Sequence, residues 1–130
     1  MKKVIETKNA PAAIGPYSQA IQAGDFLYVS GQIPIDPETN TMFLDNRGSI
    51  ADQAGQSLRN LKAVLEAAGY SLKDVIKTTV FITDMAHFAS FNTVYAKYFE
   101  KDCPARSCVA VKELPKGALV EIEAVAYKQR

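Results

Sequence analysis

The amino-acid sequence predicts a single α+β domain over residues 1–130, in which two helices cover one face of a β-sheet. Two stretches carry apolar residues at helical spacing, and several shorter stretches alternate apolar and other residues as half-buried strands do. Each longer strand has one aliphatic face that suits burial under helices. A chain of this length can form a hydrophobic core of its own.

The first part of the chain is expected to form strands. Lys3 to Thr7 is a candidate edge strand. Gln19 to Ala23 and Phe26 to Ile33 are expected to pair as a hairpin around Gly24-Asp25. The residues that follow are rich in Pro, Asp and Asn, which predicts a longer turn region over 34–48.

The rest of the chain combines two helices with further strands. Ser49 is the expected N-cap of a helix that Gly69 ends, and Asp84 is the expected cap of a second helix. The apolar stripes of the two helices, both interpreted as core, are Ala54, Leu58, Leu61, Leu65 and Ala68, and then Phe88, Phe91, Tyr95, Tyr98 and Phe99. Strands are expected over Val75 to Thr83, Ser107 to Val111 and Leu119 to Tyr127.

Strand alternation divides these side chains between two faces, provided that no strand carries a bulge. One face is aliphatic and holds Leu27, Val29, Gly31, Ile33, Ser107, Val109, Val111, Val120, Ile122, Ala124 and Ala126. The other holds Phe26, Tyr28, Ser30, Gln32, Arg106, Cys108, Glu121, Glu123 and Tyr127. Because the second face mixes apolar groups with charges, we expect another subunit to cover it. A few polar groups in an apolar enclosure are also typical of small-molecule sites.

Charge and cysteine content exclude several classes of protein. The chain has 15 basic and 14 acidic residues, a formal net charge of +1, which argues against a nucleic-acid or membrane-surface partner. It shows no membrane-spanning run and no signal peptide at its start. Cys103, Cys108 and the single His87 do not suffice for a disulfide scaffold or a zinc site. No metal is therefore expected, and a reduced cytoplasmic location is the default.

Arg106 is the side chain best suited to hold a small acid. It follows Pro104, which a helix cannot continue through, and stands at the start of a predicted strand. The planar guanidinium matches a carboxylate with two parallel hydrogen bonds. The alternative is a structural ion pair within the chain, with Glu121 or Glu123 as the partner.

Other kinds of catalysis have less support in the sequence. Cys108 lacks a base, because His87 lies in the first turn of a helix, and Ser30 has no Ser-His-Asp pattern. No glycine-rich loop precedes a helix to bind phosphate. Glu121 and Glu123, two apart on one strand, are a weak signal for a glycosidase pair. What remains is an arginine that holds a carboxylate and a glutamate that positions water.

Six stretches carry a resemblance to a known family: Gly15–Ala20, Ser30–Pro34, Val75–Phe81, Phe91–Tyr95, Pro104–Ser107 and Val120–Ala124. They resemble the reactive intermediate deaminase A (RidA) family, also called the YjgF/YER057c/UK114 family, over essentially the whole chain. The most specific signal is Pro-Ala-Arg-Ser followed later by Glu-Ile-Glu.

The resemblance implies a chorismate-mutase-like fold, a mixed sheet with two helices on one face. It implies a homotrimer whose sheets form a central barrel. It also implies clefts between neighbouring subunits that hydrolyse 2-imino acids, such as 2-iminobutanoate and 2-iminopropanoate, to 2-oxo acids and ammonia. Neither a metal nor an organic cofactor is implied.

The resemblance also implies roles for individual residues. Arg106 matches the arginine that binds the substrate carboxylate, and Glu121 matches the glutamate associated with the attacking water. Residues that match the lining of the cleft are Tyr17, Ser30, Asn92 and Cys108. Two alternatives stay open: an endoribonuclease that inhibits translation, and a non-catalytic sensor or holdase that binds small carboxylates.

Overall fold

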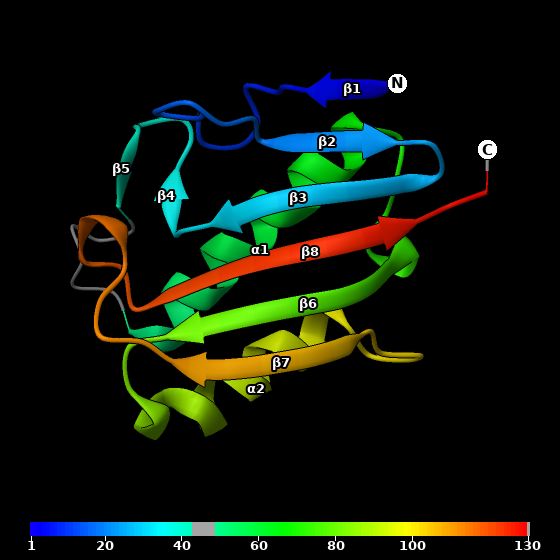
Figure 1. Ribbon diagram of the computed structural model, residues 1–130. Coiled ribbons are helices and arrows are strands. Elements are labelled where there is room, and N and C mark those ends of the chain that lie inside the picture. The colour runs from blue at the N-terminus through cyan, green and yellow to red at the C-terminus, as the bar shows by residue number, and fades with distance from the viewer. Residues whose placement is uncertain (43–48, 130) are drawn as a thin grey trace.

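The computed structural model describes residues 1–42 and 49–129, which form a mixed β-sheet with two helices on one side (Figure 1). The strands of the main sheet are β1 (Lys2–Ile5), β2 (Ala20–Ala23), β3 (Phe26–Gln32), β6 (Val75–Ile82), β7 (Ala105–Ala110) and β8 (Val120–Tyr127). Their order is β1-β2-β3-β8-β6-β7. Neighbours are antiparallel except for the parallel pair β6 and β7. The predicted α+β class is confirmed, as is the hairpin of β2 and β3.

Helix α1 (Ile50–Ala67) begins and ends where the capping residues predict. The Ser49 hydroxyl accepts a hydrogen bond from the Asp52 backbone N–H at 3.1 Å, which satisfies one of the free donors of the first turn. Gly69 adopts a positive φ of 82° just beyond the helix, a conformation that glycine reaches without steric cost.

Helix α2 (Phe88–Tyr98) starts one turn later than its cap. The Asp84 carboxylate accepts a hydrogen bond from the Ala86 N–H at 2.9 Å and caps a short 3₁₀ turn, Met85–His87, that leads into the helix. Neither α1 nor α2 is long and apolar enough to cross a lipid bilayer, within the residues that the structure describes.

The hydrophobic core lies between the helices and the sheet. Its fully buried side chains include Leu27, Leu58, Leu61, Val64, Leu65, Val80, Ile82, Phe91, Val120 and Ile122. Burial of each large apolar side chain stabilises the fold by about 1.5–3 kcal/mol. We call the covered side of the sheet the helix face and the other side the open face.

Central strand β8 follows the predicted alternation. Val120, Ile122 and Ala124 are buried on the helix face, whereas Glu121 and Glu123 point to the open face. Two neighbouring strands, β3 and β6, pair with β8 along its length, so its side-chain directions are determined by hydrogen bonding on both edges.

The predicted faces are wrong at the end of β3, because the strand carries a bulge. Val29 pairs with Ala124 and Gln32 pairs with Ile122, so two residues of β3 stand opposite one residue of β8. Gln32 is 5% exposed and lies on the helix face, not on the open face. Gly31 correspondingly lies on the open face.

The predicted faces of β7 are reversed. In the parallel register Arg106 lies beside Thr78 and Cys108 lies beside Val80, and both β6 partners are buried under the helices. Arg106 and Cys108 are therefore on the helix face. Val109 is 46% exposed on the open face. Alternation correctly separated the side chains of β7 into two sets. The aliphatic set was predicted to lie under the helices, but in this edge strand it is the other set that does.

Part of the predicted turn region forms a second, small sheet. Its strands are β4 (Ile35–Asp36) and β5 (Thr41–Met42), which pair antiparallel. The Asn60 side-chain amide on α1 donates to the carbonyl of Ile33 at 3.1 Å and to that of Ile35 at 2.9 Å, which fastens this segment to the helix. The predicted turn over residues 43–48 lies outside the described residues.

Candidate active site

The guanidinium of Arg106 is held between strand β7 and helix α2. Its Nη1 donates a hydrogen bond to the Asn92 side-chain oxygen at 2.8 Å. Its central carbon lies 4.8 Å from the ring centroid of Tyr95 and 5.5 Å from that of Phe88. These residues, with the adjacent Cys108, form what we call the arginine cluster.

The alternative considered for Arg106, an ion pair with Glu121 or Glu123, is not formed. Both glutamates lie on the open face, whereas Arg106 lies on the helix face of the same sheet. Within the described ranges, the groups that contact the guanidinium are an amide and two aromatic rings, none of them anionic. A half-buried cation with neutral partners keeps donors available for an anionic ligand.

Tyr95 is held in place beside the guanidinium by a hydrogen bond and by packing against two other rings. Its hydroxyl lies 2.7 Å from the Thr78 hydroxyl on β6, and both side chains are buried. Its ring packs between Phe91 and Phe99, with centroid separations of 5.5 and 4.8 Å. Burial raises the pKa of the Tyr95 phenol, so the side chain stays neutral beside the cation.

Cys108 does not have the properties of a nucleophile. Burial raises the pKa of its thiol, and the nearby positive charge of Arg106 only partly offsets that effect. The thiolate is the reactive form, so a raised pKa lowers reactivity at neutral pH.

A second group of side chains lies on the open face, and we call it the glutamate cluster: Glu121, Gly31 and Ser30. The Glu121 side chain packs directly over Gly31, and a Cβ at position 31 would overlap its carboxylate. Ser30 is fixed from the other direction, because its hydroxyl donates to the Ser18 carbonyl at 2.6 Å. The bulge of β3 thus provides the room that Glu121 occupies.

The carboxylate of Glu121 is a better base than an exposed one. Burial is the main cause that raises its pKa, and the like charge of Glu123 two residues away adds to it. A carboxylate with a raised pKa holds an abstracted proton more readily, which suits a group that activates water.

Tyr17 lies on the loop before β2, next to Ser18 of the bulge contact. Its side chain is 53% exposed, and its hydroxyl accepts a hydrogen bond from the Ile14 N–H at 3.4 Å. It lines a pocket of about 660 Å³ between residues of the N-terminal segment and Pro37 and Asn40 of the later turn region. That pocket includes neither Arg106 nor Glu121, so we do not assign the chemistry to it.

One chain therefore holds the predicted site residues in two separate clusters. Asn92 and Cys108 join Arg106 on the helix face of the edge strand, and Ser30 lies with Glu121 on the open face. Strand β6 separates β7 from β8 (Figure 1). The structure of one chain does not bring Arg106 and Glu121 together.

Three contributors were not among the predicted site residues. Phe88 and Tyr95 were interpreted as core, which is confirmed by the burial of Tyr95 and the packing of Phe88 against the core, and their rings also face the guanidinium. Their spacing around Asn92, four residues before it and three after it, places all three on one side of a helix and is a usable signal. Gly31 depends on a bulge that alternation does not reveal. In the described ranges no group of three or more His, Cys, Asp or Glu is arranged to hold a metal ion.

Comparison with known proteins places the sheet and its two helices among the YjgF and RidA structures. The solved structure of RidA from a Psychrobacter species superposes with a TM-score of 0.91 at 45% identity, covering 97% of this chain and 99% of that one. The structure of Escherichia coli TdcF with bound serine gives a TM-score of 0.91 at 47% identity, over 97% and 98% of the two chains.

Sequence comparison identifies the family. The chain belongs to the family whose model is described as endoribonuclease L-PSP, which matches residues 7–128. A RutC family protein of Pyrococcus horikoshii is 60% identical, over 99% of this chain and 100% of the relative. A Salmonella typhimurium relative named 2-iminobutanoate/2-iminopropanoate deaminase is 48% identical, over 99% and 100% of the two chains. The predicted RidA membership is confirmed.

The contact of Gly31 with Glu121 predicts a specific steric coupling. Gly31→Ala should destabilise the fold by about 1–3 kcal/mol, because the new methyl group displaces the Glu121 side chain from its γ-carbon outward. Glu121→Ala should relieve most of that cost in the double variant. Urea unfolding of the two single variants and the double variant measures the coupling, and strictly additive effects would contradict it.

The two roles of Tyr95 should be separable. Tyr95→Phe keeps the ring but removes the bond to Thr78, so stability should fall by about 1 kcal/mol while 2-oxobutanoate binding is retained. Tyr95→Leu removes the ring face and should weaken binding by roughly 3- to 30-fold. Calorimetric titration and urea unfolding measure both, with Thr78→Val as the matched control. Equal loss of binding in the Phe and Leu variants would show that the ring does not matter.

Proposed function

We propose that the protein hydrolyses 2-imino acids, such as 2-iminobutanoate and 2-iminopropanoate, to 2-oxo acids and ammonia. The observation that carries the proposal is the guanidinium of Arg106, which is held by uncharged groups and keeps donors for a carboxylate. The deaminase name of the Salmonella relative supports the same substrate class, and the serine bound to TdcF supports the binding of a small carboxylate.

The reaction needs few protein groups. A protonated imine has an electrophilic carbon, which water attacks to form a C–O bond. Glu121 accepts the proton that the water loses, while the C=N π electrons move to nitrogen and a carbinolamine forms. Glu121 then returns that proton to the amine nitrogen, the C–N bond breaks to release ammonia, and the C=O bond of the 2-oxo acid forms as the hydroxyl proton passes through Glu121 to the solvent. Arg106 holds the carboxylate so that the imine carbon stays in place. A positioned general base contributes about 10²–10⁴-fold, and orientation contributes further.

We infer that a complete site forms between subunits of a homotrimer. Arg106 and Glu121 lie on opposite faces of one chain, so an arginine cluster needs the glutamate cluster of a neighbour. Tyr17, Ser30, Asn92 and Cys108 then line the cleft. Exposed apolar side chains on the open face support its coverage by another subunit: Phe26, Tyr28, Val109 and Tyr127.

The test of the activity is a coupled assay. A threonine dehydratase generates 2-iminobutanoate in situ, and formation of 2-oxobutanoate is followed with and without the protein. Acceleration above the spontaneous rate is expected. If 2-oxo acids bind but hydrolysis is not accelerated, the non-catalytic sensor or holdase gains support.

The family description also names an endoribonuclease, so RNA cleavage is the second activity to test. Cleavage that persists in protein freed of contaminating nuclease, and is lost in Arg106 and Glu121 variants, would favour that function.

Mixed trimers test the shared site directly. Arg106→Ala and Glu121→Gln trimers should each be nearly inactive. A mixed trimer isolated with two affinity tags contains one boundary where an intact Arg106 meets an intact Glu121, so about one third of wild-type turnover is expected. Light scattering should give three chain masses. No recovery in mixed trimers would mean that both residues act from the same chain.

Arg106→Lys tests whether binding depends on the positive charge alone or also on the planar guanidinium. Lysine keeps the positive charge but lacks the planar pair of donors, so 2-oxobutanoate binding should be restored poorly. The melting temperature of Arg106→Ala should stay close to that of the wild type, because the described residues provide no ion pair for it to lose. A large drop in melting temperature with unchanged binding would make Arg106 a structural residue.

The raised pKa of Glu121 predicts opposite effects on activity and stability. Turnover should fall as the pH drops through that pKa, which lies above the ordinary value of about 4.3. The folded state disfavours the charged carboxylate, so its stability cost appears as the pH rises through the same pKa. Glu121→Gln should therefore raise the melting temperature at pH 7 but not near pH 4. A lower melting temperature at pH 7 would contradict the prediction.

A further inference from the structure

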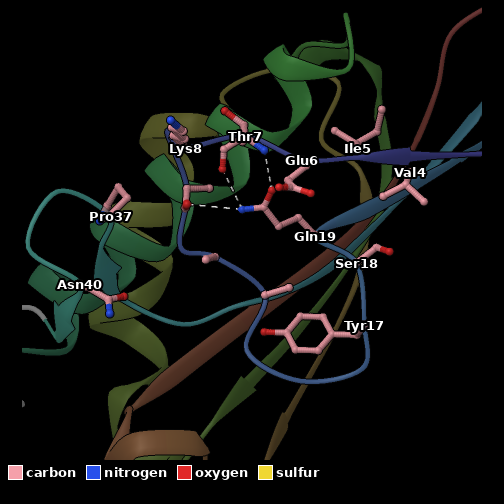
Figure 2. A pocket seen from close by; sticks show the side chains of 13 residues that line it. Val4, Ile5, Glu6, Thr7, Lys8, Tyr17, Ser18, Gln19, Pro37 and Asn40 are labelled. Carbon is pink, nitrogen blue, oxygen red and sulfur yellow. Dashed lines mark hydrogen bonds between the residues drawn. The ribbon is translucent and has the colours of Figure 1, made fainter.

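Gln19 is the centre of a hydrogen-bond network that connects three separate segments. Its side chain is 3% exposed and is satisfied entirely by backbone groups. The side-chain oxygen accepts from the Thr7 N–H at 2.7 Å. The side-chain nitrogen donates to the carbonyls of Thr7 at 3.1 Å, Ala10 at 3.4 Å and Pro11 at 2.8 Å. Figure 2 shows this amide extending toward Thr7, with Ser18 and Tyr17 following along the loop.

The backbone of Gln19 continues the network into the sheet. Its carbonyl accepts from the Ser30 N–H at 2.9 Å, at the bulge of β3. The Ser30 hydroxyl donates to the Ser18 carbonyl, so two hydrogen bonds connect the bulge to the residues just before β2. Residues 6–19 contain no helix or strand, so their backbone groups lack the hydrogen bonds of secondary structure. The Gln19 side chain supplies such bonds to Thr7, Ala10 and Pro11.

We propose that Gln19 is a positioning residue, which holds the Tyr17 loop and the bulge of β3 in the arrangement that the glutamate cluster requires. The expected effect on kcat rests on the proposed function, imine hydrolysis. The position needs an amide: a carboxylate lacks the N–H donors that the carbonyls of Thr7, Ala10 and Pro11 require. Gln19 acts on Glu121 only through the bulge, and Arg106 lies on a different element.

The experiment compares Gln19→Met with Asn60→Leu. Both changes replace a buried amide that holds backbone carbonyls with an apolar side chain. Asn60 donates to the carbonyls of Ile33 and Ile35 and accepts from the Gln56 side chain, and none of these residues belongs to either cluster. Both variants should melt at a lower temperature and remain oligomeric. Below both melting temperatures, Gln19→Met should lose about 10- to 100-fold in kcat, with 2-oxobutanoate binding within about 3-fold of wild type, whereas Asn60→Leu keeps its kcat.

Hydrogen exchange gives a measurement that does not depend on activity. Gln19→Met should accelerate amide exchange at residues 14–19 and 30–31, and Asn60→Leu should accelerate it near residues 33–35. If the wild-type protein does not hydrolyse imines, the proposed function is wrong. The exchange data would still test the positioning role of Gln19. Unchanged exchange at 14–19 and 30–31, or a kcat equal to that of Asn60→Leu, would overturn the proposal. If Gln19→Met does not fold, Gln19→Asn, which shortens the same amide, replaces it under the same criteria.

Discussion

The position of Glu121 depends on the hydrogen bonding of β8 along both of its edges. Pairing with β3 and β6 fixes the direction of each side chain, and burial of Val120, Ile122 and Ala124 selects the face that the helices cover. Glu121 must then point away from the helices. A slip of one residue would bury two carboxylates and expose the core, which the energetics of burial strongly disfavours.

The environment of Arg106 represents a compromise between stability and binding. A half-buried guanidinium without an anionic partner loses part of its hydration, and an amide and two ring faces compensate only partly. In the proposed function, a carboxylate ligand supplies the missing charge when it binds. The same argument applies to Glu121, whose burial disfavours its charged form in the folded protein. Both residues therefore occupy environments that disfavour their charges in the folded chain, which is the pattern that the proposed function requires of them.

The sequence predicted most of the elements but not all of their faces. Helix caps such as Ser49 and the alternation of β8 were sufficient, because local patterns determine them. The bulge of β3 was invisible, since a bulge is set by its hydrogen-bonded partners and shifts every later residue to the other side. The edge strand β7 was assigned backwards because Val109 faces outward although it is aliphatic. The resemblance to the RidA family named Arg106 and Glu121 as site residues. Strand alternation placed both on one face, which is wrong for Arg106.

That error matters for how the fold is connected to the proposed chemistry. Had Arg106 and Glu121 shared a face, a single chain could have held both ends of a small imino acid. Their separation by β6 means that each cluster is rigid within its own chain, one between α2 and β7 and the other on the bulge of β3 and on β8. Under the proposed function, subunit assembly is then the step that sets the distance between the substrate carboxylate and the attacking water. Dissociation of the oligomer would then abolish hydrolysis while both clusters remain folded.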